Sequence, residues 1–454
     1  MSTAVLADFG STFTKVTLVE LGSGRLIARA QAPTSVESDV MIGYQVALDE
    51  ALRSAPEIEL GPRLAASSAA GGLKVAAIGL VEDLTAAAGR QAALNAGARV
   101  ELVLHGRLGA PQTTALREAH PEVILFCGGT DGGQEQIVLE NARSIAAAGI
   151  DGHYVVACNG QIAERVAEIL AAGGSRVELV PNVMPRIGAL EVEPARAAIS
   201  EAFVHHVIQG KGLSRGTEFA REVLMPTPEA VLRATGLLAE TAGDVVVVDI
   251  GGATTDVHSA VQSSEPTPGI RGPLLPVLPV LRSVQGDLGL RSSAPSVFEA
   301  DAEWVLGNAG VSEPEVLAAV GRRAVEPGFV AVEDVDWQID RALAVACSFH
   351  AVRRHCGRLT IRSSPNQPAR ISTDGPDLRD APLLLGTGGI LVRTPSAEEI
   401  LRTAIDRSDD RSLTPRKARY GIDESYVMAA AGLLADIDRG AATRLMRENI
   451  RGVG

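Results

Sequence analysis

The chain has 454 residues, enough for two or three domains with sizeable cores. Its 55 acidic and 42 basic residues give a formal net charge of −13, and only 3% of the residues are aromatic. This composition argues against a nucleic-acid partner and against binding to anionic membranes. The four cysteines are scattered, no signal segment opens the chain, and no apolar run reaches the roughly 18 residues of a membrane span. We therefore expect a cytoplasmic α/β protein.

The first half of the chain begins with three predicted short strands, at 3–8, 14–20 and 26–31, which form an antiparallel meander. A helix over 40–54 follows. From residue 73 to residue 180, apolar runs then alternate with Ala-rich helical segments, a pattern that predicts βαβ units and a parallel sheet. The strand-like runs lie at 74–80, 99–104, 122–126, 154–157 and 177–180.

The second half begins with the strongest strand signal in the chain, V-V-V-V-D-I, which opens a second meander-like region at 244–250. A Pro- and Ser-rich stretch at 263–280 is predicted to be a loop with extended pieces. A strand at 382–385 runs into a Gly-rich turn and a further short strand at 390–392. Helices are predicted at 194–208, 228–239, 295–306, 313–320, 337–355, 397–404 and 426–436.

The first chemical motif is A-D-F-G-S-T-F-T-K, at the first predicted hairpin. A buried strand delivers Asp8 at its end, Gly10 permits a tight turn, and Ser11 and Thr12 place hydroxyls and amides at the tip. A polyphosphate needs such a concave set of N–H groups, and its Mg²⁺ needs a carboxylate within reach of a bridging water. Lys15, one hairpin step on, could approach a phosphate oxygen. The alternative is an ordinary hairpin turn.

The second motif, V-V-V-V-D-I-G-G-A-T-T-D, repeats this design about 240 residues later. An apolar strand ends in Asp249, followed by Gly251 and Gly252 and then by Thr254 and Thr255. Two such hairpins could grip a phosphate chain from both sides. One carboxylate would hold Mg²⁺-bound water while the other orients an attacking water.

The third motif is L-L-L-G-T-G-G-I, where a strand enters a Gly-rich turn that contains Gly386, Thr387, Gly388 and Gly389. In such a turn the backbone can come close to a flat ligand such as adenine. The pattern is weak alone and gains weight as the third of the series.

These three stretches, in this order and spacing, resemble the phosphate-1, phosphate-2 and adenosine motifs of the actin, sugar kinase and heat-shock chaperone ATPase superfamily. The resemblance implies two actin-like (ribonuclease H-like) domains, 1–243 and 244–454, flanking a nucleotide cleft, with an extra α/β insertion at about 73–180. It also implies that Asp8 and Asp249 hold Mg²⁺ through water and that Asp249 orients the hydrolytic water. The implied phosphate-binding residues are Gly10, Ser11, Thr12, Gly251, Gly252 and Thr254, and the implied adenosine-binding residues are Gly386, Gly388 and Gly389.

Four further segments narrow the resemblance: C-G-G-T-D-G-G, V-P-N-V-M-P-R-I-G, S-V-Q-G-D-L-G and A-R-Y-G-I-D. With the ATPase motifs they look like the MutL-type accessory proteins of glutamate mutase, whose name is shared with an unrelated mismatch-repair protein. This implies an ATP- and Mg²⁺-dependent helper that releases damaged cobalamin from an adenosylcobalamin-dependent carbon-skeleton mutase. The insertion would contact the mutase. The D-x-H-x-x-G signature of a cobalamin-binding domain is absent, so we do not expect this chain to be the mutase.

Two weaker features allow two interpretations each. Asp131, within C-G-G-T-D-G-G, could reach the phosphate site or lie in an ordinary turn. The segment C-S-F-H-A-V-R-R-H-C suggests a metal site. However, His355 and Cys356 lie two helical turns beyond Cys347 and His350 and do not complete a tetrahedron with them, which favours a core helix.

Three other functions are compatible with the ATPase motifs. One is a small-molecule kinase of the same fold, which needs a base placed against a substrate hydroxyl. Another is the activator of 2-hydroxyacyl-CoA dehydratases, whose iron–sulfur cluster requires closely placed cysteines that this chain lacks. The last is a filament-forming or scaffolding relative of actin.

Overall fold

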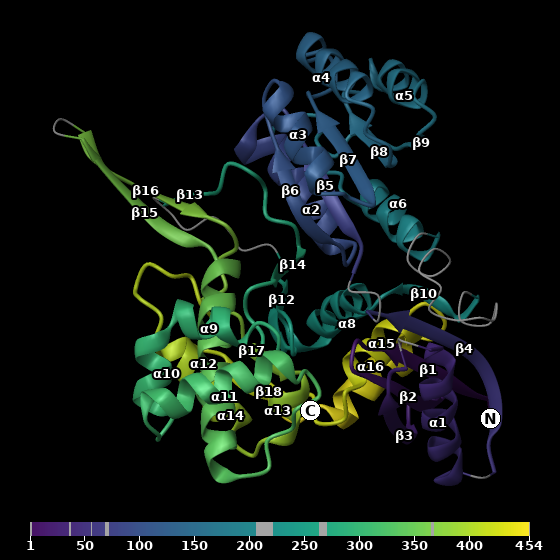
Figure 1. Ribbon diagram of the computed structural model, residues 1–454, viewed down its shortest axis with the longest axis vertical. Helices are drawn as coiled ribbons and strands as arrows, with labels where there is room; N and C mark the ends of the chain where they lie inside the picture. Colours follow the sequence, from purple (N-terminus) through teal and green to yellow (C-terminus); the bar gives the residue numbers. More distant parts are fainter. Residues whose placement is uncertain are drawn as a thin grey trace.

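The computed structural model describes residues 2–35, 38–55, 57–68, 72–205, 221–262, 270–364 and 367–453. Within these ranges the chain forms three five-stranded sheets and one three-stranded sheet. Two of the five-stranded sheets occupy the lower part of Figure 1, and the third lies above them. Within the same ranges, no helix combines the length and the apolar character needed to cross a membrane.

The first sheet has the strand order β10-β4-β1-β2-β3. Strand β2 runs antiparallel to both of its neighbours, while β4 is parallel to β1 and to β10. Helix α1 (Val40–Arg53) covers one face through its buried apolar stripe, which includes Tyr44 and Leu48. The strands are β1 (Ser2–Phe9), β2 (Phe13–Glu20), β3 (Leu26–Pro33), β4 (Glu59–Ser67) and β10 (Val223–Pro226).

The second sheet repeats this topology, with the order β14-β12-β11-β17-β18. Strand β12 is antiparallel to both neighbours, and β17 is parallel to β11 and to β18. Order and direction therefore match the first sheet strand for strand, which confirms the predicted pair of ribonuclease H-like domains and the two-domain actin-like fold. The strands are β11 (Val245–Ile250), β12 (Thr255–Ala260), β14 (Val280–Gln285), β17 (Leu383–Thr387) and β18 (Arg419–Ile422).

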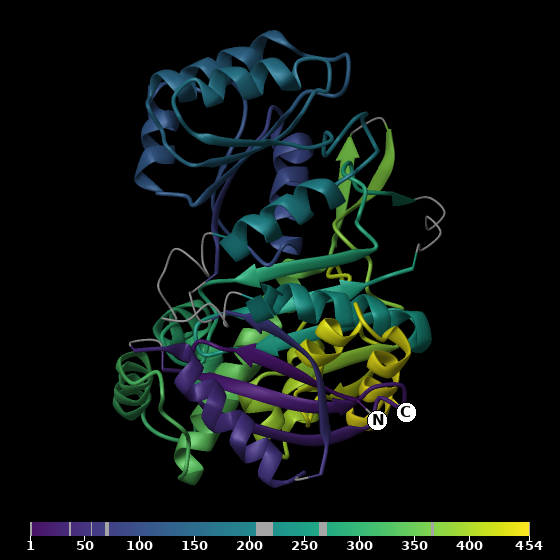
Figure 2. The same ribbon diagram turned by 90° about the vertical axis from the view of Figure 1, so that its right-hand side faces the viewer.

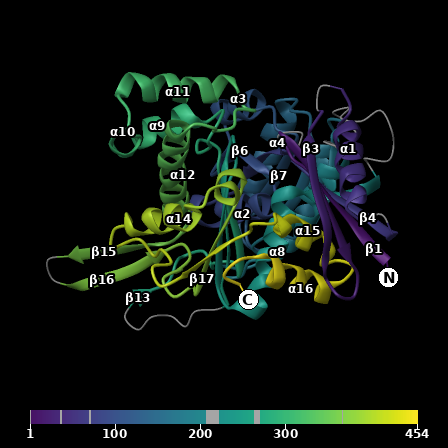
Figure 3. The same cartoon turned by 90° about the horizontal axis from the view of Figure 1, so that it is seen from below.

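Three helices fill the space between these two sheets: α8 (Thr227–Ala242), α15 (Val427–Leu434) and α16 (Arg439–Asn449). Figure 3 shows them in this position. Although α8 follows the last strand of the first sheet, it packs on β11 and β12, and α15 packs on β1 and β4. Each sheet is thus covered by a helix from the other half of the chain. The predicted division of the sequence after residue 243 stays a prediction.

Helix α15 crosses α8 at very short range. A Cβ atom added to Gly432 would lie 1.9 Å from the carbonyl oxygen of Ala230.

The insertion forms the third five-stranded sheet, whose strands are all parallel in the order β6-β5-β7-β8-β9. It lies between β4 and β10 in the chain and forms the upper layer in Figure 2, which confirms the predicted α/β insertion. Its strands are β5 (Lys74–Ile78), β6 (Arg99–Leu104), β7 (Val123–Gly128), β8 (His153–Cys158) and β9 (Arg176–Leu179). Its helices are η1 (Glu82–Ala86), α2 (Ala87–Asn95), α3 (Ala110–Glu118), α4 (Gln136–Ala147), α5 (Ala163–Ala171) and α6 (Glu193–Phe203).

The remaining elements extend the second domain. The predicted core helix with Cys347 and His355 is confirmed: it lies in α12, both side chains are buried, and His355 contacts the hydroxyls of Ser259 and Ser283. The added helices are α9 (Ala294–Ala300), α10 (Ala302–Asn308), α11 (Glu313–Val325), α12 (Asp334–His355), α13 (Gly389–Arg393) and α14 (Ala397–Asp406). A projecting sheet contains β13 (Ile270–Arg271), β15 (Arg358–Ser364) and β16 (Gln367–Asp374).

Two local predictions are wrong. The helix predicted over 295–306 is interrupted at Asp301, which separates α9 from α10. Residues 390–392, expected as a strand, belong to α13. The preceding Gly388 has a left-handed φ of +94°, which turns the chain out of the sheet, and a short apolar run alone does not distinguish strand from helix. The predicted loop over 263–280 contains β13 and the first residue of β14, and its part at 263–269 lies outside the described residues.

Candidate functional site

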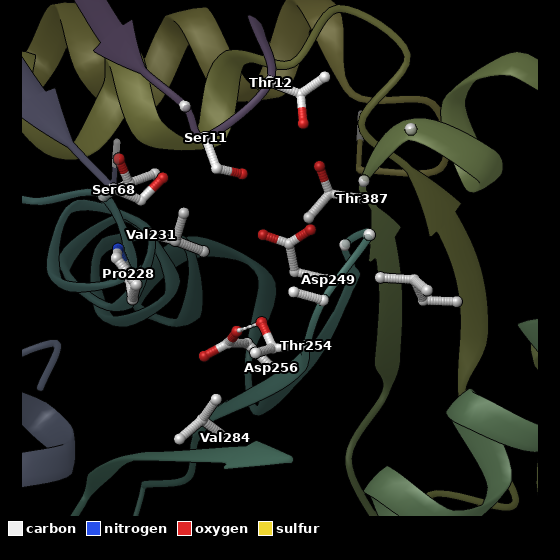
Figure 4. Close-up of a pocket in the computed structure, with 18 of the residues that line it drawn as sticks. Ser11, Thr12, Ser68, Pro228, Val231, Asp249, Thr254, Asp256, Val284 and Thr387 are labelled. Atoms are coloured by element: carbon white, nitrogen blue, oxygen red, sulfur yellow. Dashed lines mark hydrogen bonds between the residues drawn. The ribbon is translucent and has the colours of Figure 1, made fainter. Parts of the chain in front are cut away.

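A cavity of about 680 Å³ lies where the hairpins of the two domains face each other. Figure 4 shows Ser11 and Thr12 on the β1–β2 side, Asp249 on the β11–β12 side, and Thr387 at the end of β17. The ends of three strands thus deliver the three sequence motifs to one space. Twelve of the fifteen predicted site residues line it: Asp8, Gly10, Ser11, Thr12, Lys15, Asp249, Gly251, Gly252, Thr254, Thr387, Gly388 and Gly389.

The two hairpins place acids at equivalent strand positions. Asp8 lies opposite Lys15, and Asp249 lies opposite Asp256. Lys15 Nζ donates to Asp8 Oδ2 at 2.8 Å, and Thr227 Oγ1 donates to Asp8 Oδ1 at 2.6 Å. Burial disfavours the charged form of Lys15, but the neighbouring carboxylates, above all Asp8, outweigh this effect and raise its pKa. Asp8 is therefore held in place and charge-balanced by the protein.

Asp249, unlike Asp8, is not held by a neighbouring cation or hydroxyl of the described residues. Among the described residues, its half-buried carboxylate makes no hydrogen bond or ion pair. Burial raises the pKa of Asp249 to about 7, and the negative charge of Asp256 adds to the effect while Lys15 opposes it. A free carboxylate among other carboxylates fits a divalent cation, which would relieve the repulsion.

In the described ranges, no group of three or more His, Cys, Asp or Glu side chains is placed to hold a metal ion. The two carboxylates of Asp8 and Asp249 at the cavity fit a Mg²⁺ ion that keeps several of its waters, as Mg²⁺ commonly does.

The tip of the second hairpin is fixed by the S-V-Q-G-D-L-G segment and the residues after it. The N–H of Arg291 donates to the Gly252 carbonyl at 2.7 Å, and Ser293 Oγ donates to the Ala253 carbonyl at 2.6 Å. Gly289 packs so closely that an added Cβ would lie 2.4 Å from the carbonyl carbon of Ala253. The sequence showed only that this segment is distinctive. The structure shows that it fixes the turn of the second hairpin through two hydrogen bonds and one close contact.

The Gly-rich turn of the third motif packs against the second hairpin. A Cβ on Gly388 would lie 2.3 Å from the Ile250 carbonyl oxygen and 2.8 Å from Asp249 Oδ1. The same turn is hydrogen-bonded to the segment before α15, because Thr387 Oγ1 donates to Asp423 Oδ2 at 3.2 Å. Asp423 also accepts the N–H groups of the first turn of α15. The turn thus connects Asp249 to the helix that covers the first sheet.

Three predicted residues do not line the cavity. Thr255 donates its hydroxyl to the Leu288 carbonyl and is fully buried. Gly386 faces the core, where an added Cβ would meet the Leu391 and Leu401 side chains at 2.9 Å.

The third of them, Asp131, lies in the insertion. It accepts hydrogen bonds from the Gly160 N–H and from Asn182 Nδ2, both at 2.8 Å. It therefore joins three loops of the insertion and does not line the cavity, in agreement with the alternative that it lies in an ordinary turn.

The cavity also contains residues that the motifs did not reveal. Asp256 is the last residue of the second motif and lies on β12. Because side chains two residues apart in an extended chain point the same way, its spacing from Thr254 could have indicated that both face the cavity. Tyr426 has a left-handed φ of +50°, and Lys15 Nζ lies 5.2 Å from its ring centre. No local pattern predicts this contact, because its partners are separated by most of the chain. Residues of the insertion, including Arg90 and Leu94, complete the wall.

The pKa of Asp249 predicts a pH-dependent stability. Its folded-state value of about 7 exceeds the ordinary value of 3.8, so the nucleotide-free folded protein binds more protons than the unfolded chain between those pH values. Its contribution to stability therefore falls as the pH rises through that window and stays low above it. Asp249→Asn should raise the free energy of unfolding at pH 8 by up to about 4 kcal/mol, with the gain fading toward pH 4.

Urea denaturation at several pH values measures this effect. Asp83→Asn, at an exposed position, is the control and should change stability little at any pH. An Asp249→Asn gain independent of pH would contradict the prediction.

Two sheets of one topology, each ending in an Asp–Gly hairpin at a shared cavity, define a protein of the actin-like ATPase class. The chain belongs to the MutL protein family, whose model matches residues 4–450. Protein MutL from Clostridium tetanomorphum is 38% identical over 460 residues, which cover 99% of this chain and 99% of that one.

Solved structures are more distant. Nucleotide-free acetone carboxylase is 14% identical with a TM-score of 0.42, and the match covers 95% of this chain and 70% of that one. Glycerol dehydratase reactivase is 13% identical with a TM-score of 0.34, and the match covers 96% of this chain and 99% of that one.

Proposed function

We propose that the protein is an ATPase that reactivates an adenosylcobalamin-dependent carbon-skeleton mutase of the glutamate mutase type, by exchanging damaged cobalamin for intact cofactor. The observation that carries the proposal is the pair of opposed hairpins, in which Asp8 is neutralised by Lys15 while Asp249 is left free at the cavity. Family membership supports the accessory role. Four buried cysteines without a disulfide suit the reducing cytoplasm.

The cavity residues have distinct roles in this proposal. The backbone N–H groups and hydroxyls of both hairpin tips, with Ser11 and Thr12 on one side and Gly252 on the other, hold the triphosphate. Mg²⁺ bound through water to Asp8 and Asp249 would screen phosphate charge. Asp249, the carboxylate without a protein partner, orients the water that attacks the terminal phosphate. Gly388 and Gly389 lie where the adenosine would approach the backbone.

The insertion is the proposed contact surface for the mutase. Val81 and Leu179 are each 46% exposed. Val81 follows strand β5 and Leu179 is the last residue of β9, so both lie at the carboxyl edge of the parallel sheet. Ligands of doubly wound sheets bind at this edge. Removing the whole insertion is not a clean test, because α2 shares a core with the first sheet and Leu94 lines the cavity.

Substitutions at this edge give a sharper prediction. The double variant Val81→Asp, Leu179→Asp should capture at least about tenfold less mutase, because two charged side chains would have to be buried in an apolar interface. Its rate of ATP hydrolysis should stay near that of the original protein. Capture is measured as mutase retained by the tagged protein with and without Mg·ATP. Ile437→Asp, at an equally exposed apolar position away from the insertion, is the matched control. Equal capture by all three proteins would contradict the assignment of the insertion.

Reactivation itself is measured with captured mutase in which cyanocobalamin has replaced adenosylcobalamin. Adding the protein, Mg·ATP and adenosylcobalamin should release cyanocobalamin, followed by its absorbance, and restore mutase activity. Omitting ATP should prevent both. Release that is equally fast without ATP, or ATP hydrolysis that requires a small hydroxylated acceptor instead of water, would contradict the proposal.

A further inference from the structure

The C-terminal turn of helix α2 lies at the junction of the insertion with both ATPase domains. The side-chain amide of Asn95, the last residue of the helix, forms two hydrogen bonds to a strand backbone, as a neighbouring strand would. Its Nδ2 donates to the Val280 carbonyl and its Oδ1 accepts the Arg282 N–H, both at 2.9 Å. These backbone groups belong to β14, the edge strand of the second sheet. The insertion is thus attached to the second domain at an edge that would otherwise lack partners.

The same turn touches the first domain. Gly97 has a φ of +77° and closes the helix in a Schellman arrangement, with its N–H bonded to the Leu94 carbonyl. A Cβ at Gly97 would lie 2.7 Å from Pro226 Cβ. The next residue, Thr227, donates its hydroxyl to Asp8. Pro226, which contacts the turn, is thus followed directly by Thr227, which holds the Asp8 carboxylate of the first hairpin.

Arg282 connects this turn to the second hairpin. Its side chain is 3% exposed, and Nη1 donates to the Leu94 and Ala98 carbonyls at 2.8 and 3.2 Å. Its Nε donates to Asp256 Oδ1 at 2.7 Å, and Nη2 lies 2.6 Å from the same oxygen. Asp256 faces the cavity directly opposite Asp249. A single guanidinium thus joins helix-end carbonyls of the insertion to an acid of the cavity wall.

The chemistry of this contact disfavours separating Asp256 from the C-terminal turn of α2. A buried guanidinium that loses its carboxylate leaves an uncompensated charge, which is strongly unfavourable. The carbonyls at the end of α2 also carry the negative end of the helix dipole, which favours the cation where it is. Displacing Asp256 while leaving the α2 turn in place would break one set of these bonds. The lower-energy response is a shift of the turn and of the insertion attached to it.

We infer that Arg282 is a positioning residue that couples the nucleotide cavity to the insertion, through its simultaneous bonds to Asp256 and to the C-terminal turn of α2. This inference rests on the proposed function and extends it. The turn touches the Asp8 side through Pro226 and the Asp256 side through Arg282. Any change in spacing of the two hairpins on nucleotide binding must therefore alter one of these contacts. Such a shared element, biased from both sides, is the physical basis of coupling between sites.

Hydrogen–deuterium exchange of the full-length protein with and without Mg·ATP tests this coupling. In the unaltered protein, Mg·ATP should change the exchange rates of amides in 94–104 by about tenfold or more. Arg282→Lys keeps the charge but loses the planar fork that reaches Asp256 and the Leu94 and Ala98 carbonyls together, so at saturating Mg·ATP it should lose this exchange response. Asn95→Ala releases β14 but leaves these bonds of Arg282 in place, so it should keep the response. Arg165→Lys, at an exposed ion pair on α5, is the control and should keep it.

The outcomes separate the inference from the proposed function. Binding of Mg·ATP without any change in exchange over 94–104, or a full response in Arg282→Lys, would overturn the coupling and leave the ATPase assignment intact. Failure of the unaltered protein to bind Mg·ATP would overturn both. If circular dichroism shows that Arg282→Lys does not fold, Asp256→Asn takes its place, because Asn keeps the shape of the acid and loses the charge that holds the guanidinium. A full exchange response in this variant would overturn the coupling.

Discussion

Asp249→Asn is expected to slow ATP hydrolysis by about 10²–10⁴-fold, the range for loss of a group that orients and deprotonates an attacking water. Asn has nearly the same shape but cannot accept a proton or carry the negative charge. Nucleotide affinity should partly survive, because the hairpin amides and Asp8 with its partner Lys15 are unchanged. The measurement is single-turnover hydrolysis of Mg·ATP beside a binding titration with a non-hydrolysable analogue.

Asp83→Asn is the matched control, since it makes the same chemical change at an exposed position of the insertion. It should hydrolyse ATP at the original rate. If Asp249→Asn also hydrolyses at that rate, Asp249 does not orient the water. If it binds no nucleotide at all, its main role is in binding rather than in the chemical step.

Gly388→Ala is expected to have the second large effect. Two separate costs apply: a left-handed backbone, worth roughly 1–2 kcal/mol for a residue with a Cβ, and a clash with the Ile250 carbonyl, because the added Cβ would lie 2.3 Å from its oxygen. The turn must move away from β11. Nucleotide affinity should then fall by about 100-fold or more, because the two walls of the cavity no longer meet with their original spacing. Calorimetric titration with Mg·ATP measures the loss.

Gly174→Ala isolates the backbone cost from the clash. Gly174 has a similar φ of +87° in the insertion, and an added Cβ would meet no atom within 4 Å. Its variant should lose only the roughly 1–2 kcal/mol of the left-handed backbone and keep full nucleotide affinity. Comparable affinity losses in both variants would show that close packing at Gly388 is not what shapes the site.

Local patterns were sufficient to predict both hairpins. An apolar strand, an acid and a glycine occur within nine residues in each case, and the reason for each residue type is contained in the turn itself. The βαβ alternation of the insertion was equally visible, because buried parallel strands are uniformly apolar. The role of Asp131 was not visible, since an acid in a Gly-rich turn has the same pattern whether it meets a phosphate or the Asn182 side chain.

Long-range contacts explain the other omissions. The bond from Arg282 to Leu94 joins residues 188 positions apart, and no spacing rule links them. Strand β18 escaped prediction because its four residues, R-Y-G-I, include a glycine, and it is stabilised by pairing with β17. Helix α16 is polar over much of its length, and only its position beside α8 and α15 shows which face is buried.

The crossed arrangement of α8 and α15 affects how the protein is made. The apolar face of the first sheet, with Ala4 and Leu6, is covered by α15, which is synthesised long after the strands of that sheet. A ribosome-bound N-terminal half therefore carries an uncovered apolar sheet until α15 has been synthesised. We expect the nascent chain to depend on holding chaperones, and a stop codon placed before Val427 to yield an aggregating product rather than a stable fragment.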